Sequence, residues 1–405
     1  MSIVSIAKGV ARGVAVVPPS KSYAHRLLLA AFLSGKNVAI DNVDPSNDIL
    51  ATMDCIAALG GKVNLIGRIA SVECGTAAGD AVLPCRESGS TLRFMIPVAL
   101  ALRGKAHMTG TAKLFSRGLG EYEKIFASQG ISYTLTEDSL VAEGRLHSGL
   151  YQIDGGISSQ YITGLLFALP LLEGDSEIWI TPPVQSRPYI DITIDVLQMA
   201  GIKVDTSGNH LFISGGQRYN LPDCSVEGDW SNAAFLDIYN HIGGDVTLLG
   251  LKPHSLQGDK RYRRLFSQLE KGWCEINLGN CIDLGPVLFT LAAIKHGARF
   301  INTARLRIKE SDRVADILCE LEKAGVTATV SDNAVEIRPI PKQRRASLEK
   351  ENILYDSHND HRLAMSLAAL ATISGARLQG AESVAKSYPG FFNELKRLGI
   401  EIKDE

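Results

Sequence analysis

One pattern occurs six times along the chain: a short polar segment, an apolar run rich in leucine and small residues, and a glycine that ends the run. Such a repeat decides the architecture, because each unit buries its apolar face only against its neighbours. Each run of 11 to 14 residues is apolar nearly all round and starts at Ser or Asp, which predicts a buried helix. The six segments are SKSYAHRLLLAAFLSG, SGSTLRFMIPVALALRG, SSQYITGLLFALPLLEG, DWSNAAFLDIYNHIGG, DLGPVLFTLAAIKHG and DHRLAMSLAALATISG.

A second helix is expected after each buried one. These segments carry apolar residues at helical spacing, as at Val314, Ile317 and Leu321, with charges elsewhere, which is typical of an outer helix. Alternating stretches such as KVNLIG and AVEIRPI predict strands between the helices. The unit is therefore about 70 residues of strand, buried helix, strand, outer helix, strand and strand. The second helices end at Gly60, Gly130, Gly201, Gly272, Gly325 and Gly399.

Two bodies of three units each are predicted, because three units make about 200 residues, an ordinary domain size. One seam is expected near Gly228 and the other at Pro18-Pro19, since prolines cannot continue a central strand. One domain then comprises residues 1–19 with 228–405, and the other comprises residues 20–227. We expect two globules with the active site in the cleft between them.

Composition limits the classes of function. The 405 residues include 42 Lys and Arg against 44 Asp and Glu, and this formal charge of −2 gives no overall attraction to nucleic acid or an anionic membrane. Seven scattered cysteines without a C-x-x-C pair fit neither a zinc ribbon nor a disulfide framework. We therefore expect a cytoplasmic protein with no signal peptide, membrane span or nucleic-acid partner.

Polar and basic residues gather at the starts of the buried helices. A buried helix carries a cation such as Arg93 only beside a neutralising partner, which is either a protein carboxylate or an anionic ligand. Hydroxyls and cations at a helix N-terminus also suit a phosphate ester, although Ser and Asp are common there as simple caps. The residues are Lys21, Ser22 and Arg26; Ser88, Gly89, Ser90 and Arg93; Ser158, Ser159 and Gln160; Asp229; Asp283; and Asp360, His361 and Arg362.

The segment RLRIKESDRVADIL holds a further cluster of charges ahead of an outer helix. One interpretation is a solvated helix start with Ser311 as its N-cap. The other is functional, because Lys309 and Arg313 are four residues apart and could hold one anion. Glu310 is then a candidate acid or base.

Eight segments in order resemble the 5-enolpyruvylshikimate-3-phosphate synthases, a family of enolpyruvyl transferases. They are PPSKSYAHRLLLAA, ESGSTLRFMIP, SSQYITGLL, SRPYIDIT, EGDWSNAAF, RIKESDR, NDHRLAMS and VAKSYPGFF. The resemblance implies two inside-out α/β domains, each of three βαβαββ units with pseudo-threefold symmetry. It also implies transfer of the carboxyvinyl group of phosphoenolpyruvate to the 5-hydroxyl of shikimate 3-phosphate, with release of phosphate, in aromatic amino acid biosynthesis. Such an enzyme is expected to act as a monomer, without a metal or an organic cofactor.

The resemblance assigns residues by their matching motifs. It implies acid and base roles for Asp283 at the 5-hydroxyl and for Glu310 with Lys21 at C3 and the leaving group. The residues matched to shikimate 3-phosphate are Lys21, Ser22, Arg26, Ser158, Ser159, Gln160, Ser186, Tyr189, Asp283 and Lys309. Those matched to phosphoenolpyruvate are Lys21, Gly89, Arg117, Gln160, Arg313, Arg362 and Lys386.

The chain departs from the family at Glu87-Ser88-Gly89-Ser90, where N-x-G-T is common. The rival family, the UDP-N-acetylglucosamine enolpyruvyl transferases, typically carries Lys-Asn at the first helix and a cysteine in a mobile loop. Here the pair is Lys21-Ser22, and residues 113–120 contain no cysteine. A second rival is an RNA-end-binding protein of related repeats, for which RYRR (261–264) and KQRR (342–345) would be the binding surface. We interpret both clusters as solvated faces.

Overall fold

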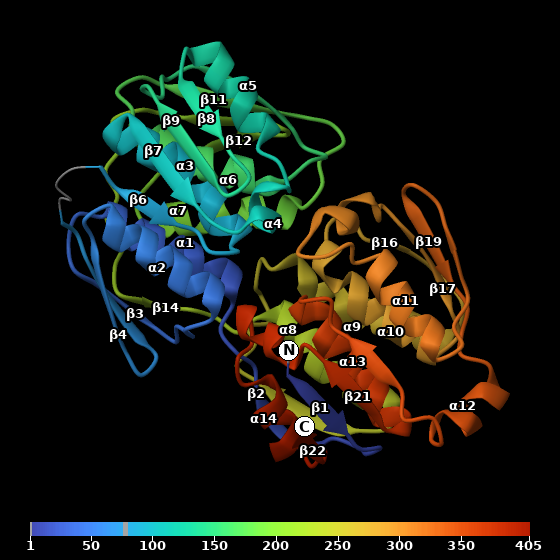
Figure 1. The fold of residues 1–405 in the computed structure, drawn as a ribbon. Coiled ribbons are helices and arrows are strands. Elements are labelled where there is room, and N and C mark those ends of the chain that lie inside the picture. Colours follow the sequence, from blue (N-terminus) through green and yellow to red (C-terminus); the bar gives the residue numbers. More distant parts are fainter. Residues whose placement is uncertain (1, 76–79) are drawn as a thin grey trace. The chain divides into compact units, whose positions relative to one another are not determined.

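The computed structural model describes residues 2–75 and 80–405, residue 346 by its backbone alone. The chain divides into two compact units (Figure 1). The N-terminal unit is Pro19–Glu227, and the C-terminal unit combines Met1–Pro18 with Gly228–Glu405.

Within the described residues, five of the six sheets share one strand arrangement. A parallel pair is followed by two antiparallel strands, so each sheet holds four strands. The sheets of the N-terminal unit are β14 (Cys224–Ser225), β3 (Val38–Asp41), β5 (Ile69–Glu73), β4 (Lys62–Ile66); β6 (Val82–Pro84), β7 (Lys105–Thr109), β9 (Ser139–Glu143), β8 (Ser132–Leu135); and β10 (Leu150–Asp154), β11 (Ser176–Thr181), β13 (His210–Ile213), β12 (Asp205–Ser207). Those of the C-terminal unit are β16 (Glu275–Asn277), β17 (Ala298–Ile301), β19 (Ala334–Ile337), β18 (Ala328–Val330); and β20 (Leu354–Asp356), β21 (Ala376–Gln379), β1 (Ile3–Ile6), β22 (Ile402–Asp404).

The fourth repeat is shorter than the other five. Its sheet is the parallel pair β2 (Arg12–Val16) and β15 (Asp245–Leu249), and only residues 272–274 separate its outer helix from β16. The two antiparallel strands predicted for this repeat do not occur in that described segment. In the sequence, this difference appears as the shorter interval between Gly272 and Gly325.

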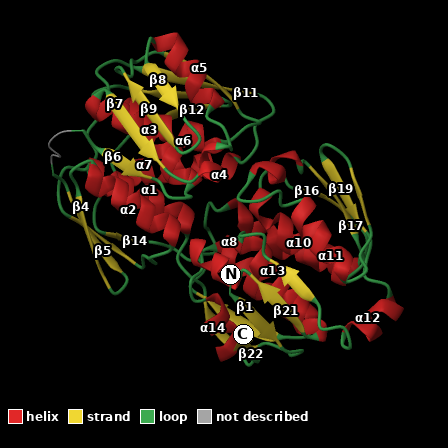
Figure 2. Cartoon of the chain, in the orientation of Figure 1, coloured by secondary structure: helices red, strands yellow, loops and turns green. Residues whose placement is uncertain are grey.

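One buried helix belongs to each repeat, and Figure 2 shows these helices inside each unit with strands around them. Every residue of α10 is buried, whereas strands such as β11 alternate between buried and exposed positions. Helices α6, α8 and α10 have 10, 8 and 10 residues, shorter than predicted. The first two continue as short 3-10 helices, Leu169–Leu171 and Ile238–Ile242. The buried helices are α1 (Lys21–Leu33), α3 (Gly89–Arg103), α6 (Ser159–Ala168), α8 (Trp230–Asp237), α10 (Gly285–Ile294) and α13 (His361–Ser374).

The second helices pack one face inward and end at the predicted glycines, each of which has a positive φ that favours glycine. They are α2 (Asn47–Ala58), α5 (Gly120–Gln129), α7 (Arg187–Met199), α9 (Tyr262–Lys271), α11 (Ala315–Lys323) and α14 (Phe391–Arg397). Two short helices, α4 (Ala112–Phe115) and α12 (Lys342–Leu348), lie outside this pattern.

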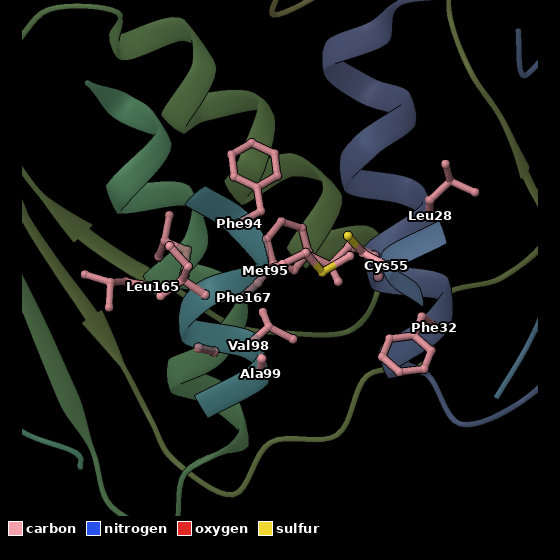
Figure 3. Packing of buried hydrophobic residues seen from close by; sticks show 14 of the residues in the cluster. Leu28, Phe32, Cys55, Phe94, Met95, Val98, Ala99, Leu165 and Phe167 are labelled. Atoms are coloured by element: carbon pink, nitrogen blue, oxygen red, sulfur yellow. The ribbon is translucent and has the colours of Figure 1, made fainter. Parts of the chain in front are cut away.

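Each unit has its own hydrophobic core. In the N-terminal unit, side chains of α1, α3 and α6 belong to one buried cluster, and Leu28, Met95 and Leu165 are among those labelled in Figure 3. The approach of α3 to α6 depends on Gly164, because a Cβ there would lie 2.4 Å from the carbonyl oxygen of Arg93. Among the described residues, no helix is long and apolar enough to cross a membrane. The predicted class, an α/β protein of repeated units, is confirmed.

Candidate active site

The first buried helix presents Lys21 and Arg26 at its start. Ser20 caps α1, as its side chain accepts a bond from the backbone N–H of Tyr23. Lys21 Nζ donates to Oδ2 of Asp48 at 2.6 Å. Arg26 lies one turn further along and is 3% exposed.

The guanidinium group of Arg26 is held by uncharged oxygens. Its Nη1 donates to the carbonyl oxygen of Ser22 at 2.7 Å and its Nη2 to that of Tyr189 at 3.1 Å. Its Nε donates to Thr193 at 2.8 Å, and Nη2 also reaches Thr163 at 3.1 Å. Burial lowers the pKa of Arg26 to about 10, so the group keeps its charge at neutral pH. Three predicted residues, Ser22, Arg26 and Tyr189, are therefore in contact.

A second buried cation, Arg93, joins α3 to α6. Its Nη1 donates to Oε1 of Gln160 at 3.2 Å and its Nη2 to the carbonyl oxygen of Gly118 at 3.0 Å. Gln160 Nε2 in turn donates to the hydroxyl of Ser90 at 3.0 Å. Ser90, which lies in the segment that departs from the family pattern, therefore still bonds to the predicted residue Gln160.

Gly89 begins α3 directly beside Arg117. A Cβ added to Gly89 would lie 2.8 Å from Nη1 of Arg117, so only a glycine leaves the guanidinium group in place. Ser88 caps the helix and accepts a bond from the backbone N–H of Thr91. The N-terminus of α3 and a cation thus face the same point, an arrangement that suits an anion.

The two buried arginines of this unit form no ion pair with a carboxylate among the described residues. Arg26 and Arg93 each bond to hydroxyl, amide or carbonyl oxygens, as given above. Burying an unneutralised cation is costly unless an anion joins it. Of the two partners that the sequence left open, the structure therefore favours an anionic ligand for Arg26 and Arg93.

Three serines of the predicted set lie at the starts of α6 and α7. Ser158 caps α6 and accepts a bond from the backbone N–H of Gln160 at 3.3 Å, and Ser159 is buried beside it. Ser186 is buried and has a φ of 58°, an uncommon left-handed conformation for serine. Strained backbone of this kind concentrates at functional sites.

In the C-terminal unit, three cations surround the carboxylate of Asp283. Arg313 Nη1 donates to its Oδ1 at 2.9 Å, and Lys309 Nζ lies 3.4 Å from the same oxygen. Arg362 Nη2 lies 3.3 Å from Oδ2. For these three cations the neutralising partner is therefore a protein carboxylate rather than an anionic ligand.

Arg313 is the centre of this network. It is 1% exposed, and its Nη2 donates to Oε2 of Glu310 at 2.6 Å. Its Nε donates to Oδ2 of Asp360 at 2.7 Å. Burial alone would lower the pKa of Arg313, but Asp360, Glu310 and Asp283 raise it above its ordinary value. Arg313 therefore remains charged and orders both predicted acid and base residues.

Lys309 carries a strongly altered pKa. Burial lowers it to about 8, opposed by Asp283, while Arg305 and Arg313 lower it further. A lysine with a pKa near neutral pH exchanges protons readily under physiological conditions.

The last two predicted cations belong to the sixth repeat. Arg362 is 7% exposed and its Nη1 donates to the hydroxyl of Ser231 at 2.5 Å. Lys386 Nζ donates to the carbonyl oxygen of Asn359, next to Asp360, at 2.7 Å. All six predicted residues of this unit thus lie in or beside one network.

The interpretation of Ser311 as a helix N-cap is wrong. Helix α11 begins at Ala315, and Oδ1 of Asp312 accepts bonds from the backbone N–H groups of Val314 and Ala315. Ser311 is buried, with its hydroxyl 3.5 Å from Oδ2 of Asp360.

Sequence reasoning missed the contacts between these cations and two carboxylates. Asp48 accepts the bond from Lys21, and Asp360 accepts two from Arg313. Asp48, near the start of a second helix, was not singled out in the sequence, and Asp360 was named there only as one of the polar residues at the starts of the buried helices. Their contacts join residues 27 and 47 positions apart, for which one sequence carries no signal. Among the described residues, no group of three or more His, Cys, Asp or Glu could hold a metal ion.

The resemblance to the enolpyruvyl transferases implies a fold of repeated α/β units, and the structure consists of such units. Solved structures share the fold over all of this chain. The EPSP synthase from Acinetobacter baumannii matches over 100% of both chains with a TM-score of 0.80 at 23% identity. The enolpyruvyl transferase NikO from Streptomyces tendae matches over 100% of this chain and 98% of its own, with a TM-score of 0.75 at 15% identity.

The family model of EPSP synthase (3-phosphoshikimate 1-carboxyvinyltransferase) matches residues 7–395. A 3-phosphoshikimate 1-carboxyvinyltransferase from Clostridium kluyveri is 41% identical over 100% of this chain and 99% of its own. One from Clostridium beijerinckii is 36% identical over 98% of each. The chain therefore belongs to the EPSP synthase family. It is an enzyme, and the resemblance drawn from the motifs is confirmed.

Proposed function

We propose that this enzyme transfers the carboxyvinyl group of phosphoenolpyruvate to the 5-hydroxyl of shikimate 3-phosphate, with release of phosphate. Membership of the family over residues 7–395 supports the reaction. The observation that most supports anionic substrates is that Arg26 and Arg93 are buried and that no described carboxylate neutralises them. Two multiply charged substrates would supply the missing negative charge.

Shikimate 3-phosphate is assigned to the polar helix starts of the N-terminal unit. Arg26 and Ser22 are proposed to hold its carboxylate, which would supply a negative charge to neutralise Arg26. Serine hydroxyls and backbone N–H groups at a helix start suit its phosphate. The residues proposed for this phosphate and for the ring are Ser158, Ser159, Gln160, Ser186 and Tyr189.

Phosphoenolpyruvate is assigned to Gly89 and to cations of both units. Arg117 and the N-terminus of α3 meet at Gly89, where a side chain would displace the guanidinium group. We propose that Lys21, Arg117, Gln160, Arg313, Arg362 and Lys386 complete its site.

The chemistry needs two positioned proton-transfer groups. The 5-hydroxyl must lose a proton as its oxygen attacks C2 of phosphoenolpyruvate, and C3 must gain one, which gives a tetrahedral ketal. The methyl carbon then returns a proton as phosphate leaves. We propose Asp283, assisted by Lys309, for the hydroxyl, and Glu310 with Lys21 for C3 and the leaving group. Cations around the departing phosphate stabilise its developing charge.

The remaining expectations concern partners and location. We propose that the enzyme works as a monomer in the cytoplasm, with small molecules as its only partners. The near-zero net charge argues against a nucleic-acid partner, and the seven free cysteines of the described chain fit a cytoplasmic location.

Calorimetric binding of shikimate 3-phosphate tests the assignment of Arg26. Wild-type protein should bind the ligand, and Arg26→Met should bind it at least about tenfold more weakly, because a charge-assisted bond is lost. Asp332→Asn, at an exposed position, is the matched control and should bind as wild type does. Equal affinity of Arg26→Met and wild type would contradict the proposed orientation of the ligand.

A further inference from the structure

Two of the second helices each carry a glutamate that is buried. Glu121 on α5 is 2% exposed, and Glu320 on α11 is 1% exposed. Each forms an ion pair with the lysine three residues later: Lys124 Nζ donates to Oε1 of Glu121 at 2.6 Å, and Lys323 Nζ donates to Oε2 of Glu320 at 2.7 Å. Glutamate is rarely buried so fully, and neither the motifs nor the proposed chemistry gives these two a role.

Both glutamates accept a hydrogen bond from the same point of their repeats. Oε2 of Glu121 accepts a bond from the backbone N–H of Asp154 at 3.0 Å, and Oε2 of Glu320 accepts one from that of Asp356 at 2.9 Å. Asp154 ends β10 and Asp356 ends β20, and in the described sheets each of these strands lies at an edge. An edge strand presents N–H groups that its sheet does not pair, so each glutamate supplies an acceptor from the outer helix of the preceding repeat.

The turn after each aspartate is built in the same way. Oδ1 of Asp154 and Oδ1 of Asp356 each accept a bond from the backbone N–H two residues later, at 2.7 Å in both turns. The N-cap of the next buried helix follows each aspartate by four residues, as Ser158 for α6 and as Asp360 for α13. The glutamate therefore holds the first residue of a short turn that ends at a helix cap.

The turn in the C-terminal unit is held by a further contact. His358 Nε2 lies 3.0 Å from Oε1 of Glu320. His358 and Asn359 have φ values of 49° and 54°, which non-glycine residues adopt only where the surroundings impose them. Burial would raise the pKa of Glu320, but bonds from His358, Lys323 and a backbone N–H lower it below its ordinary value. The acceptor that holds this turn is therefore an ionised carboxylate.

Both turns lead into residues assigned to the substrates. The turn of the N-terminal unit leads into residues 158–160, which are assigned to shikimate 3-phosphate. In the other turn, the carbonyl oxygen of Asn359 accepts a bond from Lys386 Nζ at 2.7 Å, and Arg362 follows in the first turn of α13. Lys386 and Arg362 are both assigned to phosphoenolpyruvate. Because binding groups must be held to within a fraction of an ångström, a shift of either turn would weaken one substrate in particular.

We propose that Glu121 and Glu320 are positioning residues, each of which holds the turn that carries substrate-binding groups of its own unit. Glu121 acts through the backbone of Asp154 on residues 158–160, and hence on shikimate 3-phosphate. Glu320 acts through the backbone of Asp356 on the groups that bind phosphoenolpyruvate. The inference rests on the proposed function and on its assignment of these residues.

Steady-state kinetics of Glu121→Met and Glu320→Met test the proposal, because methionine fills a similar volume but accepts no strong hydrogen bond. The readout is the ratio of the KM for shikimate 3-phosphate to the KM for phosphoenolpyruvate. This ratio should rise at least about threefold in Glu121→Met and fall at least about threefold in Glu320→Met. Glu322→Met, at an exposed position of α11, is the matched control and should leave the ratio unchanged. A ratio that stays constant, or moves in the same direction in both variants, would overturn the proposal.

Glutamine variants test whether the acceptor oxygen is the cause. Glu121→Gln and Glu320→Gln keep an oxygen for the backbone N–H, and the amide group of the second can donate to His358. Their KM ratios should stay within about twofold of wild type. Ratios shifted as far as in the methionine variants would contradict the role of the hydrogen bond.

Milder variants serve if a methionine variant does not fold. Glu121→Asp keeps the charge near the start of α5 but withdraws it from Asp154, and His358→Asn tolerates a left-handed backbone but is too short to reach Glu320. Each should shift the KM ratio at least about twofold, in the direction expected for its own turn, and no shift in either would overturn the proposal. Turnover by wild type separates the two levels, since its absence would overturn the proposed function itself.

Discussion

Arg313 and Asp360 form a two-point contact in which Nε lies 2.7 Å from Oδ2 and Nη2 lies 3.3 Å from Oδ1, and both side chains are buried. The contact fixes the plane of the guanidinium group, so that Nη1 faces Asp283 and Nη2 also faces Glu310. The two proposed proton-transfer residues thus depend on a carboxylate that touches neither of them directly.

Asp360→Asn should therefore cost stability as well as rate. Removing one partner of a buried charge typically costs up to about 3 kcal/mol, and here Arg313 would keep Asp283 and Glu310 but lose its two-point contact. We expect the free energy of unfolding in urea to fall by about that amount and kcat to fall with it. Glu275→Gln, which removes only an exposed pair with Arg299, should change stability by less than about 1 kcal/mol. Equal stability of Asp360→Asn and wild type would show that the contact is not structurally important.

Asp283→Asn should act mainly on turnover. Asparagine has nearly the same shape but cannot accept the proton of the 5-hydroxyl, and general base catalysis contributes typically 10²- to 10⁴-fold. We expect kcat to fall at least about 100-fold, with each KM changed far less. Steady-state kinetics with both substrates measures this, and an unchanged kcat would remove Asp283 from the base role.

The pH profile should reveal Lys309. Its pKa is lowered to about 8 in the folded protein, so the ammonium group is charged below that pH and loses its proton as the pH rises through 8. If the charged form supports the reaction, kcat should fall above about pH 8. Lys309→Arg keeps its charge throughout this range and should move that alkaline limb upward. The same limb in both proteins would assign it to another group.

Gly89→Ala should weaken phosphoenolpyruvate binding. The new Cβ would lie 2.8 Å from Nη1 of Arg117, which is too close, and the flexible guanidinium group would move away. We expect a KM for phosphoenolpyruvate raised about tenfold or more and an unchanged KM for shikimate 3-phosphate. Gly67→Ala probes backbone strain alone, since Gly67 has a φ of 60° and open space at the Cβ position. A normal KM in Gly89→Ala would mean that Arg117 does not bind the substrate from this position.

The sequence could predict the repeat and the helix ends because both are local. Ser20, Ser88 and Asp229 cap their helices through their side chains, and the glycines after the second helices have positive φ. The α-helix α8 is shorter than predicted, since the following segment IYNHI forms a 3-10 helix. Local patterns of hydrophobicity do not distinguish these two helix types.

The partner of each buried cation could not be predicted. Arg26 and Arg313 look alike in the sequence, as arginines near the start of a helix. In the fold, Arg313 meets three carboxylates, whereas Arg26 meets carbonyl and hydroxyl oxygens. The difference arises from contacts between distant repeats, which periodicity does not encode.

Phosphate release from phosphoenolpyruvate, measured with one acceptor at a time, tests the proposed function most directly. We expect release in the presence of shikimate 3-phosphate, loss of that release in Asp283→Asn, and no release with UDP-N-acetylglucosamine. Release with UDP-N-acetylglucosamine but not with shikimate 3-phosphate would contradict the account.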